Sequence, residues 1–320
     1  TELAYFHPGK TTNPHDNTRT PGGSSSGSAA VIAAHMAPLS IGTQTNGSVI
    51  RPASYCGVVG YKPSYGLISR SGVMRQSDKL DHIGVFGKTV EDVALFAKSL
   101  IKKDLYDPST IHYAADEMLN VCKKGPIYEP KFIFYKTKNW KNIDKESQKS
   151  FDFFIKTFSK NIEVFDTPSY FDDIPKYHKI IHETDMANNF QGYYKKSKKF
   201  LSKEMVSAIE RGLKYSAKEY AEAIDFMKRS YESYKEVFED FHGVLTPSSS
   251  GVAPKGLKST GSPEFSTIWT YMGLPSISLP LLIGANNLPL GIQLVGDKLD
   301  DLRFLGVANW LEKNCKKYAK

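Results

Sequence analysis

The sequence predicts an α/β protein in which a mixed β-sheet is covered by helices. Short apolar runs between glycines and prolines, which are typical of strands and tight turns, fill residues 1–100 and return in residues 243–320. Residues 101–240 contain fewer glycines and more lysines, and their apolar residues recur at three- and four-residue spacing, as in amphipathic helices. We therefore expect a single domain over residues 1–320, with one α/β core and a helical insertion at about 101–240.

The first region is expected to alternate between strands and helices. A helix over residues 89–103 has the clearest start, because Thr89 is a favourable N-cap and Glu91 and Asp92 place negative charge in the first turn. A second helix is expected over residues 28–37. Apolar runs predict strands within residues 37–45, 55–63 and 81–89.

The sequence pattern of residues 101–240 is mainly that of helices, and the pattern of residues 243–320 is mainly that of strands. Apolar periodicity predicts helices over residues 145–160 and 216–241, whereas residues 131–136 are expected to form a strand. The third region is expected to contain strands within residues 243–251, 274–283 and 290–296, followed by a helix over residues 300–314.

The composition is that of an ordinary globular protein, since 40% of the 320 residues are hydrophobic and 24% are charged. Cys56, Cys122 and Cys315 have no paired or metal-like spacing, which favours a reducing compartment without disulfides. His178 and His182 lie four residues apart on a possible helix, but no acidic pattern completes a metal site, so we interpret them as structural. No metal and no cofactor are expected.

A formal net charge of +8 raises the question of an anionic partner. The densest lysine group, "YYKKSKKFLSK" at residues 193–203, fits the solvated face of a helix, and a phosphate-binding patch is the alternative. No nucleic-acid-binding motif accompanies it, so a nucleic-acid partner is not favoured. The amino terminus does not resemble a signal peptide, and no apolar run reaches the roughly 18 residues that span a bilayer. We expect a cytoplasmic protein that does not bind membranes.

Serine and glycine fill every position of "GGSSSGS", residues 22–28, directly before a run of small apolar residues. Residues 23–27 match G-x-S-x-G, which would make Ser25 the nucleophile of an α/β-hydrolase, but that motif follows a strand and this run follows a polar loop. A turn of this composition before a helix also directs several backbone amides toward one point, where an anion or a developing oxyanion can bind. The remaining interpretation is a tight turn whose serines only cap the helix.

A second stretch, "TQTNGS" at residues 43–48, ends an expected buried strand. Asn46 and Gly47 adopt left-handed backbone angles more easily than other residues, so Ser48 is expected to stand on a sharp turn. Consecutive backbone amides would then lie beneath its Oγ, which is the arrangement that a serine nucleophile and its oxyanion require.

Together the two stretches resemble the amidase signature family. The resemblance runs through "PGGSSSGSAA", "PLSIGTQTNGSVIRPASYCGVVGYKPSYGLISRSGV" and "LDHIGVFGKTVEDVALF", and it returns in the block that begins "GVLTPSSSGVAPKG". It covers residues 1–100 and 243–312, whereas residues 101–240 fall where such families vary. The resemblance implies the amidase signature fold, a mixed α/β sheet covered by helices.

The resemblance also implies a role for each residue of the two stretches. Ser48 becomes the nucleophile, and Ser24 becomes a bridging serine that is reached through a cis Gly23–Ser24 peptide. The implied oxyanion and substrate-binding groups are the amides of Thr45, Asn46, Gly47 and Ser48, together with Gly23 and Ser25.

The implied reaction is acyl transfer on a small-molecule carboxylic amide. Ser48 attacks the amide carbonyl and passes its proton to Ser24. By way of a lysine, that proton reaches the leaving amine, and water then frees the acid.

The family's lysine lies on a segment before the serine-rich run, and "TELAYFHPG" resembles the stretch just before that run. We therefore expect the chain to be amino-terminally truncated and to lack this lysine. Lys10 and Lys62 are the nearest candidates, and neither is assigned the role. A fragment of a longer enzyme and a shortened, inactive relative both fit this pattern, and little or no activity is expected from this chain alone.

Three functions remain open. The first is an amidase that hydrolyses a carboxylic amide to an acid and ammonia or an amine. The second is an aminoacyl-tRNA amidotransferase A-type subunit, which uses the same chemistry, and the third is a non-catalytic relative. The sequence permits a homodimer without specifying one.

Overall fold

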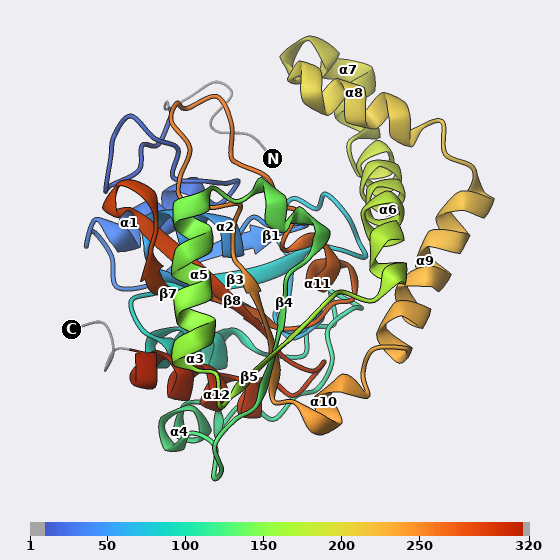
Figure 1. Cartoon of the computed structure of the whole chain (residues 1–320). Helices are drawn as coiled ribbons and strands as arrows, with labels where there is room; N and C mark the ends of the chain where they lie inside the picture. The colour runs from blue at the N-terminus through green and yellow to red at the C-terminus, as the bar shows by residue number, and fades with distance from the viewer. Residues whose placement is uncertain (1–9, 316–320) are drawn as a thin grey trace.

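The computed structural model describes residues 10–315, and its centre is an eight-stranded mixed sheet in the order β1-β3-β2-β7-β8-β6-β4-β5 (Figure 1). Neighbouring strands are antiparallel except for the β6–β4 and β4–β5 pairs, which are parallel. The strands are β1 (Ser40–Gln44), β2 (Val59–Lys62), β3 (His82–Gly87), β4 (Phe132–Tyr135), β5 (Ile162–Phe165), β6 (Gly243–Pro247), β7 (Ser276–Ile283) and β8 (Pro289–Val295). The predicted α/β class is confirmed.

Four helices cover one face of the sheet. They are α3 (Val90–Leu100), α4 (Met118–Lys124), α5 (Lys145–Thr157) and α12 (Asp301–Cys315). Alternate strand side chains point to this face. On β4, for example, Phe132 and Phe134 are buried among these helices, whereas Ile133 and Tyr135 belong to the core of the opposite face.

The opposite face is covered by two groups of helices. Near β1, β3 and β2 lie α1 (Ser26–Ala33) and α2 (Ile50–Cys56); near β4 and β6 lie α6 (Ile174–Asn189), α9 (Ala217–Glu232), α10 (Val237–Asp240) and α11 (Thr267–Tyr271). Two further helices, α7 (Gln191–Ser197) and α8 (Lys203–Gly212), pack against α6 at the end of an arm that projects from the body of the molecule (Figure 1). Short 3-10 turns occur at η1 (Lys138–Asn142), η2 (Ser169–Asp173), η3 (Lys198–Phe200) and η4 (Ala285–Asn287).

Most expected elements are present, with a few differences. The Thr89 N-cap is confirmed, because its side chain accepts from the Asp92 amide and Asp92 accepts from the Thr89 amide in return. Helices α2, α4 and α11 and strand β5 were not expected, and the expected helix over residues 216–241 is divided into α9 and α10. Residues 101–240 contribute strands β4 and β5 to the sheet as well as helices. Within residues 10–315, no helix is both long and apolar enough to cross a membrane.

Candidate active site

Hydrogen bonds fasten the serine-rich run to the end of β1. The Ser25 hydroxyl donates to the Thr43 carbonyl at 3.1 Å and accepts from the Thr43 amide at 3.1 Å. The Ser25 amide donates to the Ser48 carbonyl at 3.4 Å. The Gly23–Ser24 peptide is cis, as the family resemblance implied. These contacts place the backbone next to Ser24 beside that of Ser48.

Gln44 closes the turn that follows β1, residues 45–48. Its side chain is buried, and its Oε1 accepts from the amides of Val49 at 2.8 Å and Ile50 at 3.0 Å. Its Nε2 donates to Thr270 Oγ1 on α11 at 2.9 Å. The first amides of a helix have no partner within the helix. By accepting from two of them, Gln44 caps the start of α2 and also fixes the turn.

Three carbonyls of the turn are held by donors from three different helices. The Thr45 carbonyl accepts from His178 Nε2 at 2.9 Å, the Asn46 carbonyl from Thr270 Oγ1 at 2.6 Å, and the Gly47 carbonyl from the Arg51 amide at 3.1 Å. The N–H of a planar trans peptide points away from its C=O, so the amides of residues 46–48 face the other side of the turn. Among residues 10–315, the amides of residues 45–48 have no hydrogen-bond acceptor. Consecutive unpartnered amides of this kind can bind an oxyanion.

Ser24 lies within the serine-rich run, and Ser48 ends the turn that follows β1. Ser24 and Ser48 are both partly exposed. Neither hydroxyl hydrogen-bonds to another residue within the described range 10–315. Both hydroxyls are therefore available to hydrogen-bond to a ligand.

The turn differs from its expected backbone conformation. Neither Asn46 nor Gly47 has a positive φ, so the expectation of left-handed angles is wrong. Packing favours the glycine instead, since an added Cβ would make tight contacts, 3.0 Å from the Pro263 side chain and 3.3 Å from Arg51 Nη1. The Asn46 side chain accepts from Thr267 Oγ1 at 2.8 Å, which attaches the turn to α11 a second time.

A buried carboxylate on the loop before β3 fixes the first residue of the turn. Asp81 accepts at one oxygen from Thr45 Oγ1 at 2.6 Å. Its other oxygen accepts from the amides of Gln76 at 2.7 Å and Ser77 at 3.0 Å. Burial raises the pKa of Asp81, and these hydrogen bonds oppose that effect by stabilising the charged form.

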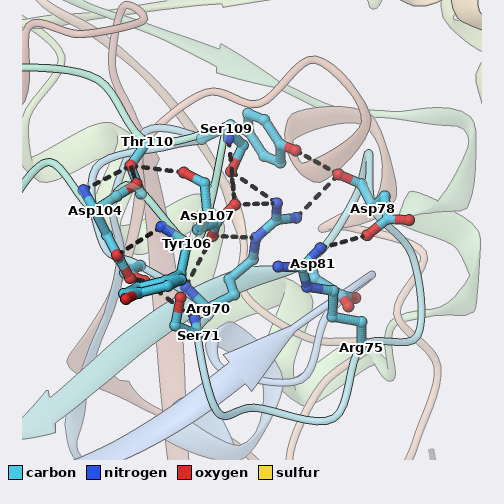
Figure 2. Close-up of polar contacts among 12 residues, drawn as sticks. Arg70, Ser71, Arg75, Asp78, Asp81, Asp104, Tyr106, Asp107, Ser109 and Thr110 are labelled. Carbon is cyan, nitrogen blue, oxygen red and sulfur yellow. Dashed lines mark hydrogen bonds and ion pairs between the residues drawn. The ribbon is translucent and has the colours of Figure 1, made fainter.

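Arg70 holds the same loop from its other side (Figure 2). Its Nε and Nη2 donate to the two carboxylate oxygens of Asp107, each at 2.9 Å, and its Nη1 donates to the Asp78 carbonyl at 2.9 Å. Hydrogen bonds from Arg70 hold the pKa of Asp107 well below its usual range. This paired arginine and carboxylate support the loop that carries Asp81.

Arg51 on α2 connects the two serine-bearing stretches. Its Nη2 donates to the Gly23 carbonyl at 2.6 Å and to Thr260 Oγ1 at 3.2 Å. Its Nε and Nη1 are buried without a partner among the described residues. Burial lowers the pKa of Arg51 to about 10, so the side chain stays charged at neutral pH. The guanidinium thus fixes the peptide that leads into Ser24.

The two lysines nearest in sequence do not join the serines. Lys62, at the end of β2, donates to the Leu274 carbonyl at 2.5 Å and to the Pro63 carbonyl at 3.4 Å. Burial lowers its pKa to about 7. Lys10 is exposed. Within residues 10–315, no lysine hydrogen-bonds to Ser24 or Ser48.

One cavity of the structure lies apart from Ser24 and Ser48. This cavity of about 410 Å³ between α5 and the end of β7 is lined by Phe153, Phe154 and Ile283 among others, and it contains none of the predicted site residues. In the described part of the chain, no group of three His, Cys, Asp or Glu side chains could hold a metal ion.

From the sequence alone, the residues that hold the turn were not connected with it. Thr270 and Asp81 had no assigned role, and His178 was interpreted as structural. The one available signal for His178 was its four-residue spacing from His182 on a helix that is otherwise partly apolar.

Known proteins resemble this chain in sequence. The amidase family profile matches residues 1–305. The A-type subunit of the glutamyl-tRNA(Gln) amidotransferase of Alkaliphilus metalliredigens is 32% identical over 341 residues, which cover 95% of this chain and 68% of the relative. The protein of the same name from Treponema denticola is 31% identical over 352 residues, which cover 98% of this chain and 72% of the relative.

Solved structures share the fold. The A-type subunit of the glutamyl-tRNA(Gln) amidotransferase of Thermotoga maritima superposes with a TM-score of 0.81 at 30% identity, covering 95% of this chain and 68% of that one. A 6-aminohexanoate cyclic dimer hydrolase in complex with its substrate superposes with a TM-score of 0.82 at 21% identity, covering 98% of this chain and 72% of that one. At that identity the second likeness shows the fold alone.

Proposed function

The chain belongs to the amidase family, and we propose that it cleaves a carboxylic amide by acyl transfer through Ser48. The observation that carries this proposal is the turn at residues 45–48, whose amides have no acceptor among residues 10–315 and end at Ser48 itself. Negative charge develops on the amide oxygen during attack. Donors that are already in place stabilise this charge without having to reorganise.

The proposed reaction has two halves. The Ser48 oxygen bonds to the amide carbon, and its proton passes to Ser24, which delivers a proton to the leaving nitrogen. The C–N bond breaks, ammonia or an amine departs, and the acyl group remains on Ser48. Water then attacks the ester, its proton returns to the Ser48 oxygen through Ser24, and the acid is released.

The hydrogen bonds around Ser24 support its proposed role as the relay. Arg51 holds the carbonyl of Gly23 on one side of Ser24, and Thr43 holds Ser25 on the other. No lysine within residues 10–315 hydrogen-bonds to Ser24 or Ser48, so we assign no lysine of this range to the proton relay. A relayed proton matters most for a poor leaving group such as an amine, so we expect activated esters to be cleaved faster than amides.

Serine substitutions test the proposal with a small acyl amide and a p-nitrophenyl ester. Ser48→Ala is expected to abolish both reactions, because the acyl group then has no acceptor. Ser24→Ala is expected to slow amide cleavage by about 10²-fold and ester cleavage less, because nitrophenolate leaves without a relayed proton.

Ser26→Ala is the matched control, since Ser26 belongs to the same run but begins α1. Its rates are expected to stay within about twofold of wild type, the small effect typical of a substitution outside the reacting groups. Hydrolysis that persists in Ser48→Ala would contradict the proposal, and a wild-type chain that never becomes acylated would favour the non-catalytic relative.

The A-type component of an aminoacyl-tRNA amidotransferase is the second candidate. It is favoured by the relatives that carry this name at 31–32% identity. The same serines would cleave the side-chain amide of glutamine and hand on the ammonia. Glutaminase activity and copurification with a B-type partner would favour this candidate, whereas hydrolysis of simple amides without glutaminase activity would favour the first.

A further inference from the structure

One side of α6 carries polar residues at helical spacing that contact the loops beside the proposed site. The contacts are His178 Nε2 to the Thr45 carbonyl at 2.9 Å, His182 Nε2 to Gln76 Oε1 at 3.2 Å, Ser77 Oγ to Asp185 Oδ2 at 2.5 Å, and Asn189 Nδ2 to the Gln76 carbonyl at 3.4 Å. Helix α6 comes from the region expected to be a helical insertion. It nevertheless packs directly against the turn and the loop that hold the candidate site.

His178 makes the contact that lies nearest to the proposed chemistry. Its side chain is only 3% exposed. A carbonyl oxygen can only accept, so Nε2 carries the proton and donates to Thr45. Burial lowers the pKa of His178 to about 4, so the ring is neutral near pH 7 and this N–H is the single one it has.

The hydrogen bond from His178 sets the direction of one peptide. The Thr45–Asn46 peptide is planar, so holding its carbonyl also aims its N–H, which is the Asn46 amide. Thr270 and Arg51 hold the next two carbonyls of the turn in the same way. Of these three donors, only His178 comes from residues 101–240.

We propose that His178 is a positioning residue for amide cleavage, which holds the Thr45–Asn46 peptide so that the Asn46 amide faces the developing oxyanion. The inference rests on the proposed acyl transfer at Ser48 and extends it. It makes His178 the contact through which α6 holds the proposed catalytic turn, without touching the substrate.

The two histidines are explained better by their hydrogen bonds than by a metal site. Each Nε2 already contacts a protein group, the Thr45 carbonyl for His178 and Gln76 Oε1 for His182. Within residues 10–315, no third ligand completes a cluster with them.

The test compares donor-bearing and donor-free side chains at residue 178. His178→Gln and His178→Met form a matched pair, because both side chains are unbranched and similar in length and only glutamine retains an N–H. His182→Met is the control on the same face of α6. The measurement is single-turnover acylation by a p-nitrophenyl ester in the full chain, which yields a limiting rate and a half-saturating ester concentration.

His178→Met is expected to lower the limiting rate about tenfold with less than about twofold change in half-saturation, because losing a whole oxyanion donor costs about 10²–10³ and misdirecting one costs part of that. His178→Gln is expected to stay within about threefold of wild type, and His182→Met within about twofold. His178→Phe supplies a second donor-free variant if thermal unfolding shows that His178→Met does not fold.

Equal limiting rates in the glutamine variant and the donor-free variants would overturn the inference, as would equal losses at residues 178 and 182. Failure of the proposed function has a different signature, since Ser48→Ala would then be acylated as fast as wild type.

Discussion

The serines between residues 24 and 28 lie in different environments. Ser25 exchanges two hydrogen bonds with the backbone of Thr43, and Ser28 Oγ donates to the Ile41 carbonyl at 2.7 Å. Both serines therefore attach the run to β1. The hydroxyl of Ser24 has no partner within residues 10–315. The expected substrate-binding role of Ser25 stays a prediction, and its hydroxyl is already engaged by Thr43.

Substitution of Gly47 tests how tightly the turn at residues 45–48 packs against the neighbouring Pro263. In Gly47→Ala the new Cβ would lie 3.0 Å from the Pro263 side chain, so the turn or the Pro263 segment must move. Small displacements of reacting groups cost up to about 10²-fold, and we expect acylation to slow at least about tenfold. Overpacking is expected to lower the free energy of unfolding by about 1 kcal/mol, measured by urea denaturation.

Gly27→Ala is the control for this substitution. Gly27 lies in α1, is exposed, and has its nearest neighbouring atom 4.0 Å from the added Cβ. Its acylation rate is expected to match wild type, with stability unchanged or up to about 1 kcal/mol higher because alanine favours the helix. Equal acylation rates in the two glycine variants would argue against tight packing behind the turn.

The elements that the sequence predicts well are those with a simple pattern or a clear boundary. Helix α3 has both, because its apolar face is periodic and a capping box begins it. Helix α2 was missed because all of its residues are buried, which removes the polar face that distinguishes a helix from a buried strand. Strand β5 was missed because only Ile162 is buried on this edge strand.

Helix α6 gives the fold a dependence on pH through its buried histidine. An unfolded histidine titrates near pH 6.5, whereas burial lowers the pKa of His178 to about 4 in the folded protein. Between these values the unfolded chain binds a proton that the folded chain does not, so stability falls as pH falls through this window. The difference between the two pKa values of His178 corresponds to about 3 kcal/mol in the free energy of unfolding.

Urea denaturation at pH 7 and at pH 4.5 checks this effect. The wild type is expected to lose about 2–3 kcal/mol more stability on acidification than His178→Gln, because glutamine does not titrate. The comparison with His178→Gln removes the contributions of the buried Asp81 and Asp185, whose pKa values burial raises. The pKa of His182 is lowered to about 3 by burial and by His178 itself, so the response of His182 to the substitution is part of the measured difference. Parallel losses in the two proteins would show that His178 is not held neutral.

At the scale of the whole molecule, segments from all three regions of the sequence meet at the turn before Ser48. Helix α6 holds Thr45, α11 holds Asn46, and α2 holds Gly47. The serines and the amides could be proposed from the sequence because they lie on two short continuous stretches, and their roles stay a prediction. The sequence could not predict the His178 contact, which joins residues 133 positions apart and leaves no local pattern.

The middle region therefore has more than one part in the fold. It adds β4 and β5 to the sheet and α6 to the site, so we propose that residues 1–320 behave as one domain. Its long helical periodicity was predicted. The division between α9 and α10 was not, because apolar residues continue across the turn at residues 233–236.

Location of the covalent intermediate tests the central claim most directly. The full chain is reacted briefly with a p-nitrophenyl ester, quenched in acid, digested and analysed by mass spectrometry. We expect the acyl mass on the peptide that contains Ser48, and none on that peptide in Ser48→Ala. An acyl group on Ser25, or labelling that does not depend on residue 48, would contradict the account.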